Sequence, residues 1–306
     1  WCCSKFWWLQ IDRPWGQCTK AIYIKYLSPN GVVYARLQIV FLVSIALGYA
    51  TVFASTAVAG LDSQSWPIWN KSDETNLAII DHSTFDGFLK TYVVTNHPSG
   101  INRFRYGDVS RRDGKRLDAY IAQMAAVDPR QYRKREQKAY WLNLYNALTI
   151  QSLLKKKRNN SLDTRKLNPR IRVAGVKLSR ADIGDRILRP IWHDYKVIFG
   201  LSCASMGCPA IQSNAFTAGN MNKLLKQSAR EFINHPRGLV VNRKEMRVSK
   251  IFDWYREDFG ADNKRLLKMF AYYADDNKAL YILGFNGDIE FSYDSRLNSP
   301  DTIWPL

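Results

Sequence analysis

Two cysteines, Cys203 and Cys208, are the side chains of this sequence best suited to covalent chemistry. They lie in the run Leu-Ser-Cys-Ala-Ser-Met-Gly-Cys-Pro-Ala-Ile (201–211), whose Ser, Gly and Pro content is typical of a tight loop. A thiolate is a nucleophile and a metal ligand, and its reactivity depends on its exposure and pKa. The mostly apolar run 196–201 predicts a short buried strand, and a polar loop after a strand commonly carries catalytic or binding groups.

One interpretation is a thiol hydrolase or transferase, with Cys203 or Cys208 as the nucleophile. This chemistry needs a base or cation near the sulfur and a third group that orients the base. The candidates for these roles are two histidines and two polar residues of one predicted helix: His193, His235, Glu136 and Asn143. The histidines would activate the sulfur, and the helix residues would orient the imidazole or stabilise an oxyanion.

Two other interpretations of the cysteine pair stay open. Cys203 and Cys208 could form a disulfide, because the residues between them include Gly207 and allow the Cα atoms to come within ~6 Å. Such a small loop gains modest entropic stabilisation, so the bridge would chiefly fix the loop's shape. A metal site has less support, because His193 and the cysteines supply three ligands with the spacing of no common zinc module. The chain has no Walker loop, no Gly-x-Gly-x-x-Gly and no Gly-x-Ser-x-Gly, and we predict no metal and no cofactor.

An unusual helix is predicted over residues 136–149. Asp128-Pro129 marks the start of this helical segment, because Asp caps free N–H groups and Pro suits a first turn. The polar residues of the helix lie among large apolar ones, and a buried asparagine needs hydrogen-bond partners. Asn143 and Asn146 therefore either brace neighbouring backbone in the core or, in the enzyme interpretation, serve the site.

Helical periodicity and turn signals divide the rest of the chain. Helices are predicted at 81–89, 114–124, 179–188 (ended by Pro190), 218–234, 250–259 and 263–274, and strand pairs at 238–241 with 246–248 and 280–283 with 289–291. Trp254 and Tyr255 have the spacing of core residues. The pattern predicts an α+β fold, a single helix-rich domain over 60–306 with a small, mostly antiparallel sheet.

Four segments carry a family resemblance. They are Glu-x-x-Ala-Tyr-Trp-Leu-Asn-Leu-Tyr-Asn-Ala-Leu-Thr (136–149), Leu-Ser-Arg-Ala-Asp-Ile-x-x-x-Ile-Leu-Arg-Pro (178–190), Cys-Ala-Ser-Met-Gly-Cys-Pro (203–209) and Tyr-Arg-Glu-Asp-Phe-Gly (255–260). Their types and order resemble the domain of unknown function 547 family, over about residues 80–292. The thiol-hydrolase interpretation would make this fold papain-like.

The resemblance also shows a departure from the family pattern. It implies a histidine before the first cysteine, in a pattern like His-Phe/Tyr-Ala-Leu-Asn-Cys. Aligned on Cys203, that position is Ile198, and Gly200 and Ser202 replace the Ala and Asn. If a Cys–His pair is the family's chemistry, this chain has lost its usual histidine or takes one from elsewhere.

The N-terminal residues differ from the rest of the sequence. Residues 1–37 are rich in Trp and Cys without sustained periodicity, and we interpret them as a doubtful extension. Residues 38–59 are interpreted as a signal peptide or membrane anchor: a basic residue, Arg36, precedes the apolar run 39–59, which ends in Ala-Val-Ala before Gly60, the pattern of a cleaved signal peptide. The apolar run 39–59 is also long enough for a membrane anchor. We therefore expect an exported protein, periplasmic or secreted, or one anchored by this run.

The positive charge bears on the partner. The chain has a formal net charge of +18, with 45 Lys and Arg against 27 Asp and Glu. The basic residues cluster at 130–135, 155–158, 165–172 and 186–189. The chain lacks a nucleic-acid recognition motif and has an apparent leader, which argues against a nucleic-acid partner. A solvated basic face, or a face that contacts an anionic membrane or acidic envelope polymer, is the expected role.

Two functional hypotheses follow from the sequence. The first is a cysteine-dependent hydrolase or transferase that acts on an unknown envelope substrate. The second is a non-enzymatic exported binding or scaffold module whose basic face contacts anionic surfaces. The first predicts a reduced cysteine of low pKa, and the second an oxidised pair or inert thiols with salt-sensitive attachment.

Overall fold

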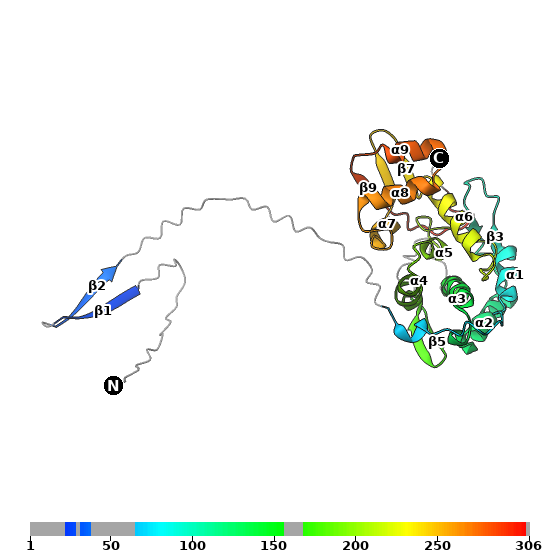
Figure 1. Cartoon of the computed structure of the whole chain (residues 1–306), viewed down its shortest axis with the longest axis horizontal. Coiled ribbons are helices and arrows are strands. Elements are labelled where there is room, and N and C mark those ends of the chain that lie inside the picture. The colour runs from blue at the N-terminus through cyan, green and yellow to red at the C-terminus, as the bar shows by residue number, and fades with distance from the viewer. Residues whose placement is uncertain (1–21, 29–30, 38–64, 156–167, 304–306) are drawn as a thin grey trace. The chain divides into compact units, whose positions relative to one another are not determined.

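The computed structural model describes residues 65–155 and 168–303, together with the backbone of two strands near the N-terminus (Figure 1). The chain divides into two compact units, Trp1–Ser55 and Thr56–Leu306, and each is described by itself. The second unit carries every element discussed below as part of the site.

The first unit contains an antiparallel hairpin of β1 (Ile22–Ser28) and β2 (Gly31–Leu37). The sequence did not predict this hairpin, because residues 1–37 show no sustained periodicity. The predicted leader or anchor, residues 39–59, lies outside the described residues. No helix in the described part of the chain is long and apolar enough to cross a membrane.

Helix α3 (Lys134–Lys155) is the centre of the second unit, and its residues 136–150 are all buried. A helix covered on all sides has no single apolar stripe, which explains its mixture of polar and apolar residues. Figure 1 shows α3 between α4 on one side and α1 and α2 on the other. The 3-10 turn η2 (Pro129–Gln131) precedes it, and the Asp128 carboxylate caps that turn by accepting from Arg130 N at 3.1 Å. The predicted start at Asp128 is confirmed, with a break between η2 and α3.

The elements before α3 form the wall that buries its first half. They are η1 (Pro67–Asn70), α1 (Ser83–Tyr92), β3 (Val93–Val94), β4 (Arg103–Phe104) and α2 (Arg111–Ala126), with β3 and β4 antiparallel. Both predicted helices are confirmed. Their buried faces carry large aromatic and aliphatic side chains, and the rings of Phe85 and Tyr120 stack with centroids 5.1 Å apart.

After α3 the chain forms a hairpin and a π-helical segment. These elements are β5 (Arg170–Val173), β6 (Val176–Ser179), η4 (Asp182–Leu188) and α4 (Arg189–Trp192). At the start of this helical segment, the Asp182 carboxylate accepts a hydrogen bond from Ser179 N at 2.8 Å. The prediction that Pro190 ends the helix is wrong. Proline lies in the first turn of α4, where its missing N–H is tolerated.

The segment before the cysteine loop is a helix rather than the predicted strand. α5 (Val197–Gly200) is one short, fully buried helical turn. A four-residue apolar run has no periodicity that separates a buried strand from a buried helix. Ser228 Oγ donates to Phe199 O at 2.6 Å and satisfies the end of this turn.

The C-terminal elements cover the other side of the loop. They are α6 (Met221–Asn234), β7 (Leu239–Val241), β8 (Met246–Ser249), α7 (Ile251–Trp254), α8 (Asn263–Tyr273), α9 (Asp276–Leu283) and β9 (Ile289–Ser292). The β7–β8 pairing is confirmed as antiparallel. The predicted pairing of 280–283 with 289–291 is wrong, because 280–283 belongs to α9 and β9 pairs parallel to β8.

The second unit is thus a helix-rich α+β structure, and the described strands form small separate sheets rather than the one small sheet expected. Among the described strand pairs only β8–β9 is parallel, which agrees with the predicted mostly antiparallel pairing. This architecture gives no support to a papain-like fold.

Candidate functional site

The cysteine loop is held from one side by helix α3. Asn146 is buried and bridges the start of the loop, because its Nδ2 donates to Gly200 O and its Oδ1 accepts from Ser202 N, both at 2.9 Å. A Cβ on Gly200 would lie 2.6 Å from the Leu225 side chain, so a larger residue here would require that side chain to shift. Ala204 follows with φ 66°, in the left-handed region that residues other than glycine rarely adopt.

The opposite side of the loop pairs with the C-terminal segment. Met206 N donates to Arg296 O and Gly207 N donates to Asp294 O, both at 2.8 Å. A Cβ on Gly207 would lie 2.7 Å from the Tyr293 ring, so glycine lets the two backbones approach. These contacts fix the loop against a segment that lies about 90 residues later in the chain.

The structure places Cys203 and Cys208 in a disulfide, with their Cα atoms 6.0 Å apart. The phenol of Tyr293 lies against both sulfurs, 3.2 Å from Cys203 Sγ and 3.4 Å from Cys208 Sγ. Ser205 Oγ contacts the same phenol and lies 3.0 Å from Cys203 Sγ. In this oxidised form neither cysteine is a thiol nucleophile.

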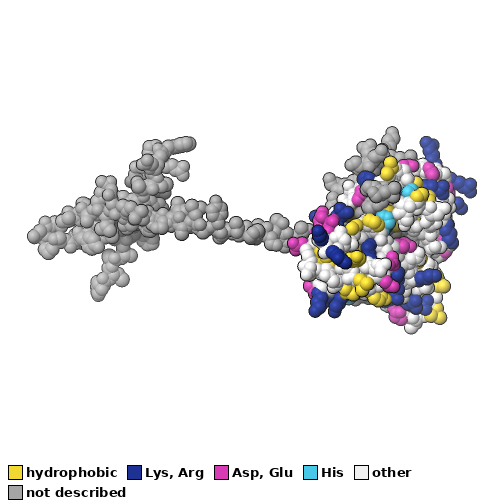
Figure 2. All heavy atoms as spheres, turned by 90° about the horizontal axis from the view of Figure 1, so that it is seen from above, with side chains coloured by type: hydrophobic (Ala, Val, Ile, Leu, Met, Phe, Trp, Pro, Cys, Tyr) yellow, Lys and Arg dark blue, Asp and Glu magenta, His cyan; other side chains and the backbone are white. Residues whose placement is uncertain are grey.

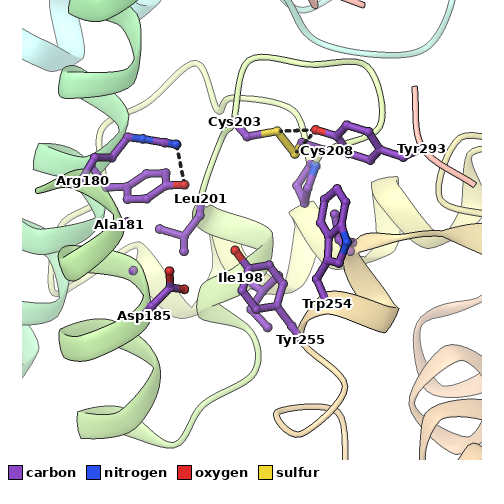
Figure 3. A pocket seen from close by; sticks show the side chains of 14 residues that line it. Arg180, Ala181, Asp185, Ile198, Leu201, Cys203, Cys208, Trp254, Tyr255 and Tyr293 are labelled. Atoms are coloured by element: carbon purple, nitrogen blue, oxygen red, sulfur yellow. Dashed lines mark hydrogen bonds between the residues drawn. A yellow bond between two sulfur atoms is a disulfide. The ribbon is translucent and has the colours of Figure 1, made fainter. Parts of the chain in front are cut away.

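A cavity of about 380 Å³ opens beside the disulfide (Figure 3). Its lining comes from α3, η4 and the two residues before it, α5, the cysteine loop, α7 and the residue after it, and the segment after β9: Tyr145, Arg180, Ala181, Gly184, Asp185, Ile198, Leu201, Cys203, Cys208, Pro209, Ile251, Trp254, Tyr255 and Tyr293. The volume is in the range of small-molecule sites. In Figure 3 the disulfide, Tyr293 and Trp254 lie across the cavity from Arg180 and Asp185, and Tyr255 lies between the two groups.

Aromatic rings make up much of the wall. The rings of Trp254 and Tyr293 are tilted against each other with centroids 4.7 Å apart. Burial raises the pKa of Tyr145 and of Tyr255, so both phenols stay protonated and can donate hydrogen bonds. A flat ligand would therefore meet ring faces and phenol hydroxyls.

The charged end of the cavity begins with Arg180. This residue is buried, its Nη1 donates to Tyr145 Oη at 2.7 Å, and its guanidinium lies 4.9 Å from the centre of the Tyr145 ring. Because Tyr145 Oη accepts from Arg180, its own proton is directed elsewhere. The pair thus places a guanidinium and a phenol side by side at this end of the cavity.

Asp185 supplies the only carboxyl group of the described lining. Burial raises its pKa, while Arg189 and Arg180 oppose this effect. Arg189 lies behind it, pairs with Asp185 at 3.1 Å and donates from Nε to Asp258 at 2.8 Å. The Arg189 guanidinium also lies 4.5 Å from the centre of the Tyr255 ring. The ion pairs hold η4 against the segment after α7, and so hold two walls together.

The two candidate histidines do not line this cavity. His193 is exposed at the C-terminal end of α4, with φ 46°. The imidazole of His235 donates from Nε2 to Ser99 O at 2.9 Å, while Nδ1 accepts from Arg237 N at 3.1 Å. Burial, and next the nearby Arg237 charge, lower the pKa of His235 to about 4. Neither imidazole is placed against a cysteine sulfur as the enzyme interpretation requires.

Glu136 and Asn143 have other structural environments. Glu136 is buried, and its carboxylate lies 3.5 Å from Ile80 N and 3.9 Å from Arg133. Asn143 bridges the backbone of Phe216, donating to its O at 2.7 Å and accepting from its N at 2.9 Å. The alternative interpretation, in which Asn143 and Asn146 brace neighbouring backbone, is therefore confirmed by the geometry.

The sequence did not identify most residues of the cavity. Arg180 and Asp185 stand inside a family motif, but nothing local distinguishes them from surface charges. Trp254 and Tyr255 were interpreted as core residues because of their helical spacing. Tyr293 had no local signal, since it reaches the disulfide only through the contacts of the C-terminal segment.

The basic clusters are partly neutralised by ion pairs. Arg130 pairs with Asp128 at 2.7 Å, and Arg186 pairs with Asp182 at 3.4 Å. Figure 2 shows Lys and Arg side chains interspersed with Asp and Glu on the face in view. Much of the other two clusters, at 155–158 and 165–172, lies outside the described residues.

Comparison with known proteins supports the resemblance in part. Neither the curated proteins nor the solved structures contain a match to this chain. Residues 129–233 match the model of the family described as "Protein of unknown function, DUF547". The matched range contains three of the four motifs, and the fourth, at 255–260, lies beyond it. Residues 129–233 of this chain are therefore a DUF547 family domain.

Proposed function

We propose that the cavity beside Cys203–Cys208 binds a small, flat organic ligand that carries a carboxylate or carbonyl oxygen, and that the protein is a binding module rather than an enzyme. The ring faces of Trp254 and Tyr293 suit a flat apolar body. Arg180 and the phenol of Tyr145 suit an oxygen acceptor at the other end.

One observation carries this proposal. The four segments that mark the family resemblance are separated in the chain, yet each contributes to the cavity wall: Tyr145, then Arg180 with Asp185, then the two cysteines, and Tyr255. If these segments served only to stabilise the fold, their side chains would not be expected to converge on one cavity. A few polar groups that converge in a mostly apolar cavity are typical of a ligand site.

Thiol chemistry is a second candidate, because both cysteine residues line the same cavity. Reduction of the disulfide would release two thiols beside the Tyr293 phenol. The described lining holds no histidine, and its one carboxyl group, Asp185, lies across the cavity (Figure 3). A hydrolase or transferase would therefore need another base, which is why we rank it second. Export, an envelope substrate and contact with anionic surfaces stay predictions.

Isothermal titration calorimetry with 2-naphthoate tests the binding proposal. Loss of a charge-assisted hydrogen bond typically removes about 1.5–3 kcal/mol, so Arg180→Gln should weaken binding by about tenfold or more. The matched control is Arg186→Gln, which removes an arginine of the same helical segment that is not part of the lining. Trp254→Ala should weaken binding, while Trp192→Ala, on α4 and outside the lining, should not.

The outcome separates the two candidates. Saturable binding that both site variants lose and both controls keep supports the binding module. No heat of binding to the wild type, or equal losses in site and control variants, would contradict it.

A further inference from the structure

A second group of side chains lies on the other side of the cysteine loop, outside the cavity lining. Arg103 is fully buried and Arg237 is 8% exposed. Arg103 Nη1 contacts the Met206 sulfur and donates to Asn298 Oδ1 at 3.1 Å, and both Nε and Nη2 donate to Ser99 Oγ. Both guanidinium groups thus flank Met206, since Arg237 Nη1 donates to Met206 O at 3.1 Å.

Neither guanidinium has an ionic partner among residues 65–155 and 168–303. Arg237 Nη1 also donates to Cys208 O, and its Nε is buried without a hydrogen-bond partner. The two guanidinium groups contact neutral oxygens, a thioether sulfur and, for Arg237, the Phe232 ring, whose centre lies 4.9 Å away. Burying a charge without an opposite charge costs several kcal/mol, so two such cations near each other call for an explanation.

Cationic groups lie close to both arginines. Burial, and next the charge of Arg103, lower the pKa of Arg237 to about 9. Lys278 is close enough to act on His235, and its Nζ donates to three backbone carbonyls, those of Ile233, Asn234 and Leu239.

The nearest acidic groups are engaged elsewhere. The carboxylate of Asp294 accepts from Arg296 at 2.6 Å, and that of Glu231 accepts from Gln227 at 2.8 Å. Each acts on one of the buried arginines only as a weaker, opposing charge, Asp294 on Arg103 and Glu231 on Arg237. The cluster therefore keeps an excess of positive charge.

The geometry points to a binding site for a small tetrahedral oxyanion, phosphate or sulfate, formed by Arg103 and Arg237 behind the disulfide loop, with His235 beside it. A guanidinium fork matches the oxygens of such an anion and can bind two of them at once. Ser99 and His235 are only half-buried and mark the side from which an ion would enter. A bound dianion would supply the missing negative charge. It would also hold the loop through Met206 and Cys208.

The test uses the full chain and inorganic sulfate, which stays a dianion at every pH of interest. Thermal unfolding is followed while sodium sulfate replaces sodium chloride at constant ionic strength. A bound ion raises the melting temperature in proportion to the logarithm of one plus its concentration over Kd. We expect a saturable rise in the wild type that Arg237→Gln loses and that the exposed control Arg265→Gln keeps.

Histidine titration by NMR needs no variant, and so it stays informative if Arg237→Gln fails to fold. The pKa of His235 and that of His82 are both lowered to about 4, chiefly by burial. A nearby dianion should raise the pKa of His235 by about one pH unit. His82, which contacts Tyr120 and not the arginines, should not change. Equal behaviour of the two histidines in sulfate and chloride, with no specific rise in melting temperature, would overturn the inference.

Discussion

Asn146 is the residue whose replacement tests most sharply how the cavity is built. Its amide satisfies the carbonyl of Gly200 and the N–H of Ser202, and the side chain is buried. Asn146→Ala would leave both backbone groups without a partner, at about 1–3 kcal/mol for each. We therefore expect the free energy of unfolding to fall by about 3 kcal/mol, measured by urea denaturation.

Asn143→Ala is the matched control. Asn143 lies one turn earlier on α3 and bridges the N–H and carbonyl of Phe216 in the same manner. Its replacement should cost a similar free energy of unfolding, but Phe216 is not part of the cavity lining. Binding of 2-naphthoate, measured where both variants are folded, should weaken by about fivefold in Asn146→Ala alone, which corresponds to ~1 kcal/mol. Equal effects of the two variants on binding, or a loss of stability well below 1 kcal/mol in Asn146→Ala, would refute this reasoning.

Three further predictions concern the disulfide and the charged wall. Cys208→Ser should lower the free energy of unfolding by about 2 kcal/mol, because the disulfide no longer restricts the chain entropy of this small loop in the unfolded state. In urea denaturation, a reductant should destabilise the wild type but not this variant. Burial raises the pKa of Asp185 in the folded protein above its ordinary value of 3.8. As pH rises, the unfolded chain therefore loses this proton first. The folded state loses stability between the pKa of the unfolded chain and that of the folded protein. Asp185→Asn should remove this decline, so that its stability relative to the wild type rises across that window in urea titrations at several pH values. Arg189→Met should cost about 3 kcal/mol or more by the same measurement, because it leaves the carboxylates of Asp185 and Asp258 without their cation.

The sequence predicted elements where periodicity or capping was strong. The helix stripe at 114–124 and the Asp-Pro start at Asp128 both hold in the structure. It failed on short apolar runs, since 196–201 and 280–283 read equally well as strands and as buried helical turns. Tertiary packing, which a local pattern does not contain, decides between them.

For the site, too, residue types were informative, whereas contacts between distant segments could not be predicted. The disulfide and the bracing role of Asn143 and Asn146 were each one of the alternatives that the residue types left open. The partners of the sulfurs were not predicted, because Tyr293 comes from a distant segment and because histidines cannot be placed in space from sequence. The departure at Ile198 was informative: the structure places no histidine in the described lining of the cavity.

Mass-spectrometric mapping of alkylation at Cys203 and Cys208, on residues 60–306 produced in an oxidising compartment, tests the central claim most directly. The account predicts that neither cysteine is labelled between pH 5 and 9 until a reductant is added, because both sulfurs are held in the disulfide that lines the binding cavity. Fast labelling of either cysteine well below pH 8 without reductant would mean an activated thiolate. That result would contradict the binding module and favour the enzyme.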